Sequence, residues 1–154
     1  MDTVSPKERS RIMSKVKGAG NKSTEQRLIF LFKQYGVKGW RRHYPMVGKP
    51  DFVFVKARLA VFVDGCFWHG CPDHCRLPST NRDYWTSKIE KNIKRDRSVT
   101  DAIREKKWRV MRIWEHELKK DRHREKLEEI KRRVAGHGRQ TEAAVGHPVK
   151  NSMI

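Results

Sequence analysis

The sequence predicts an α/β domain in which helices flank a small mixed sheet. The periodic segments follow in the order helix, strand, strand, long helix, strand, helix, which is typical of that class. A chain of 154 residues is long enough for one domain with a core of its own. A further observation is the run from Val61 to Cys75, in which an apolar strand pattern gives way to two aromatic residues, two histidines and all three cysteines.

Three parts are predicted along the chain. Residues 1–22 form a basic arm, with a short helix that Ser5, Pro6 and Glu8 begin through a capping box. Residues 23–134 form the folded domain. Residues 135–154 contain several glycines and few large apolar residues, which is typical of a disordered tail.

The domain is predicted to open with a helix from Ser23 to Gly36. Ser23 and Gln26 form a second capping box, and the glycine ends an apolar stripe of helical spacing. Glu25 sits in the first turn. A carboxylate at that position is usually only a partner of the helix dipole, although a catalytic role is the alternative.

Three short strand patterns follow. Residues 40–44 suit an edge strand, while residues 50–55 and 59–63 are joined by a tight connection and predict a hairpin. Asp51 therefore lies beside the end of the second hairpin strand. An aspartate before a strand is commonly a turn residue, so its residue type leaves a structural and a functional role open.

The second half is predicted as long helix, strand and helix. The long helix begins at Asp83, and its apolar face consists of Trp85, Ile89, Ile93, Val99 and Ile103. Asp96 falls on or beside that face. The opposite flank is basic and amide-bearing, and comprises Lys88, Lys91, Asn92, Lys94, Arg95 and Arg97. Residues 109–114 alternate as a strand, and the last helix runs from Leu118 to about Val134.

The charge of the chain indicates a polyanionic partner. Its 36 lysines and arginines against 18 acidic residues give a net charge of +18. Nucleic acid is the first expectation and an anionic membrane surface the rival. The sequence contains no apolar stretch of transmembrane length and begins with polar residues, so we expect an intracellular, cytoplasmic protein without a membrane partner.

The cysteines predict a metal centre rather than disulfides, because their number is odd and they cluster with histidine. Cys66, Cys71 and His74 supply three ligands for zinc. Either Cys75 or a distant residue completes the tetrahedron, and His116 is favoured because neighbouring residues such as 74 and 75 rarely reach one ion together. Such a closed site is structural.

Hydrolysis of a phosphodiester is compatible with the remaining polar groups. It needs a carboxylate for Mg²⁺ and a base for water. Asp51 and the backbone carbonyl near Val63 are candidates for the metal, and His69 for the base. Phe67 and Trp68 precede a polar loop, where they suit wedges between base pairs.

Together these motifs resemble a known family. The run from Gly65 to His69, with residues 50–52 before it and residues 114–116 after it, resembles the very-short-patch-repair mismatch endonucleases over about Ser10 to Lys120. The resemblance implies a restriction-endonuclease-like fold, catalytic Mg²⁺ and a structural Zn²⁺. It also implies that the chain nicks duplex DNA 5′ of the thymine at T:G mismatches that arise when 5-methylcytosine deaminates.

The resemblance also implies residue roles. Asp51 and the Val63 carbonyl match the metal ligands, His69 the general base, and Glu25 and Asp96 two further acids of the site. The DNA-contacting positions match Met13, Phe67, Trp68, Trp85, Lys88 and Asn92, of which the last two read the mispaired bases.

Two positions depart from the best-known members. Asp64 stands where those members have a histidine that contacts phosphate, and it is a candidate to help hold a metal. His116 stands where they have cysteine. Two rival functions remain: a sequence-specific restriction or homing-type nuclease that cuts matched duplex, and a zinc-stabilised DNA-binding module without catalysis. A lesion on one strand lacks two-fold symmetry, so we expect a monomer.

Overall fold

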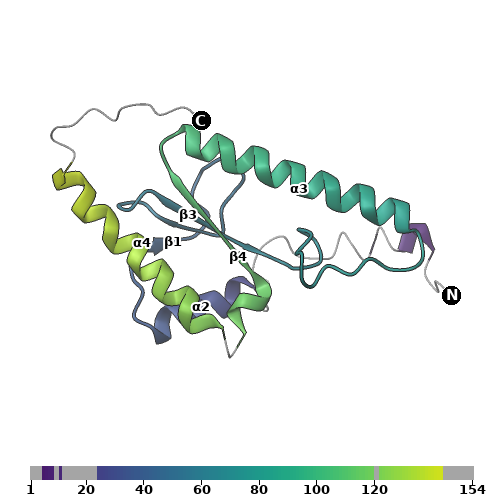
Figure 1. The fold of residues 1–154 in the computed structure, drawn as a ribbon, viewed down its shortest axis with the longest axis horizontal. Coiled ribbons are helices and arrows are strands. Elements are labelled where there is room, and N and C mark those ends of the chain that lie inside the picture. The colour runs from purple at the N-terminus through teal and green to yellow at the C-terminus, as the bar shows by residue number, and fades with distance from the viewer. Residues whose placement is uncertain (1–4, 9–10, 12–23, 120–121, 144–154) are drawn as a thin grey trace, which may run out of the picture.

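The structure is a computed structural model that describes residues 5–8, 11, 24–119 and 122–143. Its main elements are α2 (Glu25–Gln34), β1 (Trp40–Arg41), β2 (Phe52–Phe54), β3 (Leu59–Asp64), α3 (Arg82–Glu105), β4 (Arg109–Trp114), the 3-10 helix η1 (Glu115–Leu118) and α4 (His123–Ala143). The predicted α/β class, with a mixed sheet flanked by helices, is confirmed (Figure 1).

The four strands form one sheet in the order β1-β2-β3-β4. β1 and β2 pair antiparallel, as do β2 and β3, so the predicted hairpin is confirmed. β4 pairs with β3 in parallel, with Val61 opposite Met111. A parallel neighbour needs a crossover, and α3 supplies it.

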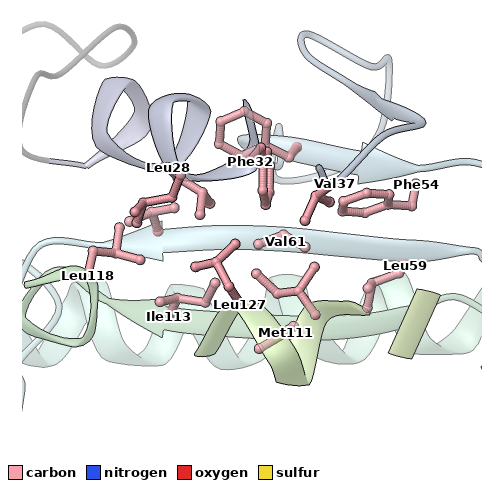
Figure 2. Packing of buried hydrophobic residues seen from close by; sticks show 14 of the residues in the cluster. Leu28, Phe32, Val37, Phe54, Leu59, Val61, Met111, Ile113, Leu118 and Leu127 are labelled. Carbon is pink, nitrogen blue, oxygen red and sulfur yellow. The ribbon is translucent and has the colours of Figure 1, made fainter. Parts of the chain in front are cut away.

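Helices cover both faces of the sheet. α3 crosses one face, whereas α2 and α4 lie on the other (Figure 1). Figure 2 shows the larger core, in which Leu28 and Phe32 of α2 and Leu127 of α4 pack against Val61 and its strand neighbours. A smaller cluster under α3 contains Val53, Ala60, Phe62, Ile103 and Val110. The central strands β2 and β3 are therefore covered on both sides, which explains their continuous apolar runs.

Helix ends agree with the sequence in part. The Glu8 N–H donates to Ser5 Oγ at 3.2 Å and the Ser5 N–H to Glu8 Oε2 at 3.4 Å, so the first capping box is confirmed. Gly36, at φ +67°, follows the last turn of α2 as predicted. Ser23 lies outside the described residues.

Two elements, β1 and the last helix, were predicted with wrong boundaries. Strand β1 ends at Arg41 instead of Tyr44, because the chain turns at His43 with φ +53°. The last helix starts at His123 and continues to Ala143, instead of running from Leu118 to about Val134. Leu118 belongs to η1, where its side chain is 1% exposed and fixes a separate turn against the core.

Candidate active site and metal centre

The sheet topology brings the chemical groups to one edge. β3 and β4 are parallel, so their carboxyl ends meet there, and the amino end of antiparallel β2 lies beside them. Asp51 precedes β2, Asp64 ends β3 and His116 follows β4. The loop after β3 carries the cysteines and His69. This shared edge is why residues far apart in sequence can form one site.

Four predicted metal ligands lie together at this edge. The ligand atoms of Cys66, Cys71, His74 and His116 all lie within 4.8 Å of one another. The His116 Nδ1 is 3.3 Å from Cys66 Sγ and 3.6 Å from Cys71 Sγ, and Cys71 Sγ is 3.7 Å from His74 Nδ1. Atoms bound to one zinc ion at about 2.0–2.3 Å lie about 3.3–3.8 Å apart, so the cluster fits zinc.

Cys75 lies outside this cluster. Its thiol donates to the carbonyl of Phe67 at 3.4 Å, and its backbone N–H donates to the carbonyl of Cys71 at 3.0 Å. Of the two candidates for the fourth ligand, the structure therefore brings His116 to the other three.

Burial shifts the pKa values of two ligands in the cluster. Burial raises the pKa of the Cys66 thiol. A hydrogen bond from the His116 backbone opposes this rise, and the nearby Cys71 adds to it. Burial also lowers the pKa of His116, helped by His74. The histidine is therefore neutral and ready to bind a metal, whereas the thiol must lose a proton when a metal binds.

The metal-binding loop is fixed to α3 as well as to the sheet. The Asn92 side-chain amide donates to the carbonyl of Trp68 at 2.8 Å. Gly70 has φ +67°, and a Cβ there would lie 2.7 Å from Ile93 Cδ1 and 3.0 Å from Ile89 Cγ2. The loop backbone thus packs directly on the helix, which leaves no room for a side chain.

Gly70→Ala is therefore expected to destabilise the protein more than Gly36→Ala. Both glycines have φ +67°, but a Cβ at Gly36 meets nothing within 4 Å. The left-handed backbone costs each alanine about 1–2 kcal/mol, and overpacking against Ile93 adds about 1–3 kcal/mol at position 70 only. Urea unfolding of both variants measures the difference. Equal losses of stability would show that the loop does not rest on α3.

A carboxylate pair lies on the α2 side of the edge. Asp51 Oδ2 accepts a hydrogen bond from the Val63 backbone N–H at 2.8 Å. Glu25, 5% exposed, forms an ion pair with Arg42. Burial raises the pKa of Asp51 to about 7; the Val63 N–H opposes this, and the charges of Glu25 and Asp64 add to it. Glu25 and Asp51 both line a cavity of about 380 Å³. Carboxylate oxygens of this kind are ligands that a divalent cation takes, and such a cation would favour the ionised form of Asp51.

A second group surrounds His69 on the α3 side. Its Nδ1 lies 2.6 Å from Asp96 Oδ2 and 3.7 Å from Asp64 Oδ1. An ionised carboxylate can only accept, so in the neutral ring the Nδ1–H donates to Asp96 and Nε2 carries the lone pair. Arg112 Nη1 donates to both oxygens of Asp64, at 2.9 and 3.0 Å. Burial raises the pKa of Asp64, while His69 and Arg112 oppose that rise.

The aromatic residues form a cluster next to His69. Phe67 lies 5.1 Å from Trp68 and 5.4 Å from Trp85 between ring centroids. Trp85 is buried at 6% exposure, whereas Phe67 and Trp68 are half-buried. Lys88 on the next turn of α3 is half-buried. Met13 lies outside the described residues.

Sequence reasoning missed the arginine partners, Arg42 and Arg112. Arg112 alternates with buried Met111 and Ile113 on β4, so it lies on the face that α3 covers. A cation on a covered face needs a counter-charge. An arginine at this position in the sequence could therefore have indicated its partner, Asp64, at the end of the neighbouring strand β3. No comparable pattern marks Arg42, which follows β1 in an irregular segment.

The mixed sheet, with carboxylates, a histidine and a Cys/His cluster at one edge, defines a nuclease of restriction-endonuclease-like fold. Residues 1–77 match the model of the family described as DNA mismatch endonuclease Vsr. The chain belongs to this family.

Relatives of the chain carry related names. It is 37% identical over 123 residues to the type II nicking enzyme V.NmeDIP of Neisseria meningitidis serogroup C. The aligned segment covers 79% of this chain and 82% of that protein. The chain is 39% identical over 106 residues to the DNA mismatch endonuclease Vsr of Escherichia coli (strain K12). This alignment covers 67% of this chain and 65% of that protein. The chain is 53% identical over 73 residues to the type II nicking enzyme V.NaeI of Lentzea aerocolonigenes. This alignment covers 47% of this chain and 44% of that protein, so the chain spans less than half of that relative.

Proposed function

We propose that the chain nicks one strand of duplex DNA 5′ of the thymine in a T:G mismatch, as the first step in repairing deaminated 5-methylcytosine. The observation that carries this proposal is the meeting of the Asp51 and Glu25 carboxyls, the oriented His69 and the aromatic loop at one sheet edge. Relatives named as a mismatch endonuclease and as nicking enzymes support it.

The catalytic metal in this proposal is Mg²⁺. Asp51 and the carbonyl of Val63 would hold it, with Glu25 beside them. When bound, Mg²⁺ supplies charge that polarises the phosphate and lowers the pKa of a water molecule. A metal-binding role for Asp64 stays a prediction. Arg112 donates to both of its oxygens, and these hydrogen bonds would compete with a metal. An Asp64→Asn variant that nicks as fast as the parent at limiting Mg²⁺ would exclude that role.

His69 is the proposed general base. With Nδ1 bound to Asp96, its Nε2 takes a proton from water as the water oxygen attacks phosphorus. The bond from phosphorus to the 3′ oxygen breaks, and that oxygen takes a proton from solvent. The products are a 3′ hydroxyl and a 5′ phosphate.

The loop and the start of α3 are proposed to recognise the mismatch. Phe67 and Trp68 would enter the stack beside the mispaired bases, supported by Trp85, and a mismatched step lowers the cost of unstacking. Lys88 and Asn92 would read the bases. Asn92 already binds the Trp68 carbonyl, so it also holds the wedge in place. Met13 in the arm would enter from the opposite groove.

Zinc in the Cys/His cluster would position the wedge and the base without taking part in the reaction. We also propose that residues 23–134 carry the activity, that residues 1–22 lie on the DNA, and that a monomer acts on its one-sided lesion at the cytoplasmic nucleoid. None of the helices in the described part of the chain is long and apolar enough to span a membrane.

Three duplexes that are identical except for a T:G, C:G or T:A pair at one position test the proposal. With Mg²⁺ we expect nicking of the T:G duplex only, 5′ of the thymine. Cleavage of both strands of matched duplex would support a restriction-type nuclease, and binding without cutting would support a DNA-binding module. Binding is also expected to weaken steeply with salt, because a net charge of +18 indicates many phosphate contacts.

A further inference from the structure

Arg112, on β4, is held by partners on two other elements, β3 and α3. Besides its two hydrogen bonds to Asp64, its Nε donates to Thr100 Oγ1 at 3.1 Å and its Nη2 to the Asp96 carbonyl at 3.3 Å. Its Cζ lies 4.3 Å from the centroid of the Phe62 ring. The side chain is only 23% exposed. Arg112 thus ties the end of β3 to the middle of α3.

Both acids that Arg112 holds face the same ring nitrogen. Asp96 Oδ2 lies 2.6 Å and Asp64 Oδ1 3.7 Å from His69 Nδ1, and the side chains of the two acids are 17% and 7% exposed. Two poorly hydrated carboxylates repel each other, and each can accept the single Nδ1–H. The guanidinium charge offsets the repulsion and occupies both oxygens of Asp64. Asp96 is thereby left as the closer acceptor.

We propose that Arg112 is the positioning residue for His69. By holding Asp64 and the α3 backbone at Asp96, it fixes the hydrogen bond from Nδ1–H to Asp96, and with it the ring orientation that points the Nε2 lone pair at water. This rests on the proposed function, in which that lone pair takes a proton from water. Arg112 itself touches neither the water nor the phosphate.

Four variants test this role: Arg112→Met, Arg112→Lys, Asp64→Asn with Arg112→Met, and Arg104→Met. Arg104 and Arg112 both line a cavity of about 380 Å³ beside His69, but Arg104 is exposed, so it is the charge-matched control. Single-turnover nicking at saturating T:G duplex measures the chemical step, and fluorescence anisotropy measures DNA affinity. Thermal melting confirms folding.

Arg112→Met is expected to slow the single-turnover rate by about 10–100-fold with little change in affinity, because a misplaced base loses much of its contribution. Arg112→Lys should recover part of the rate. The double variant should be no slower than Arg112→Met, since the arginine acts through Asp64. Arg104→Met should nick at the parental rate. If Arg112→Met instead weakened binding and left the saturated rate unchanged, Arg112 would be a DNA contact and the proposal would be overturned.

The ring tautomer gives a readout that does not need nicking. Nitrogen-15 NMR of the zinc-loaded protein without DNA, with His69→Gln for assignment, is expected to show the Nδ1–H tautomer in the parent and a changed Nδ1 chemical shift in Arg112→Lys and the double variant, because the hydrogen bond from Nδ1–H to Asp96 is altered. An unchanged Nδ1 chemical shift in these folded variants would overturn the proposal. A parent that shows the tautomer but does not nick T:G duplex would contradict the proposed function alone.

Discussion

Asp51→Asn is expected to abolish nicking and, without Mg²⁺, to make the folded protein more stable near neutral pH. The asparagine Oδ1 can still accept the Val63 N–H, so the local geometry is kept. It cannot carry the charge that holds a divalent cation. Activity should fall to background while DNA binding is retained.

The gain in stability follows from the raised pKa of Asp51. Burial is the main cause of its rise from 3.8 to about 7. Between these two values the folded state holds a proton that the unfolded state has released, so stability falls as the pH rises through this window. Above about pH 7 the full cost of about 2–4 kcal/mol is present in the parent and absent from the asparagine variant.

Urea unfolding of zinc-loaded, Mg²⁺-free protein between about pH 5 and pH 8 measures this effect. The two stability curves should diverge as the pH rises, and added Mg²⁺ should stabilise only the parent. Asp101→Asn is the matched control, because Asp101 is exposed. Parallel curves would contradict a buried charge at Asp51, and retained nicking would remove Asp51 from the chemistry.

Removal of zinc is expected to abolish mismatch binding and nicking together. Cys66→Ser breaks the Cys/His cluster, whereas Cys75→Ser makes the same change outside it and keeps a donor for the Phe67 carbonyl. The metal joins the loop to His116 beyond β4, so its loss should cost more than about 4 kcal/mol of stability. Cys75→Ser should behave as the parent.

Zinc content by elemental analysis, anisotropy with T:G duplex and single-turnover nicking measure the three consequences. The wedge at Trp68 and the base at His69 share one loop, so affinity and rate should fall together. Equal zinc content in the two serine variants would contradict the assignment of the cluster. Full nicking by the zinc-free Cys66→Ser protein would show that the metal does not position the base.

Local sequence patterns predicted most of the fold. Hydrophobic patterns predicted the hairpin, the long helix and the strand at residues 109–114. The residues that each element buries lie within one unbroken segment of sequence, so the pattern can be read locally. The last helix was misplaced because Leu118 has helical spacing but is buried by η1, a turn that responds to tertiary packing. The short β1 likewise depends on a left-handed backbone at His43.

The sequence by itself determined the chemical inventory of this protein. Clustered cysteines and histidines, an acid before a strand and a motif from Gly65 to His69 need only residue type and spacing. Tertiary structure decided which of these groups meet. It brought His116 rather than Cys75 to the metal ligands, and placed Arg112 against Asp64 and Asp96. These partners lie on different strands and helices, and only the parallel pairing of β3 and β4 under α3 sets their separations.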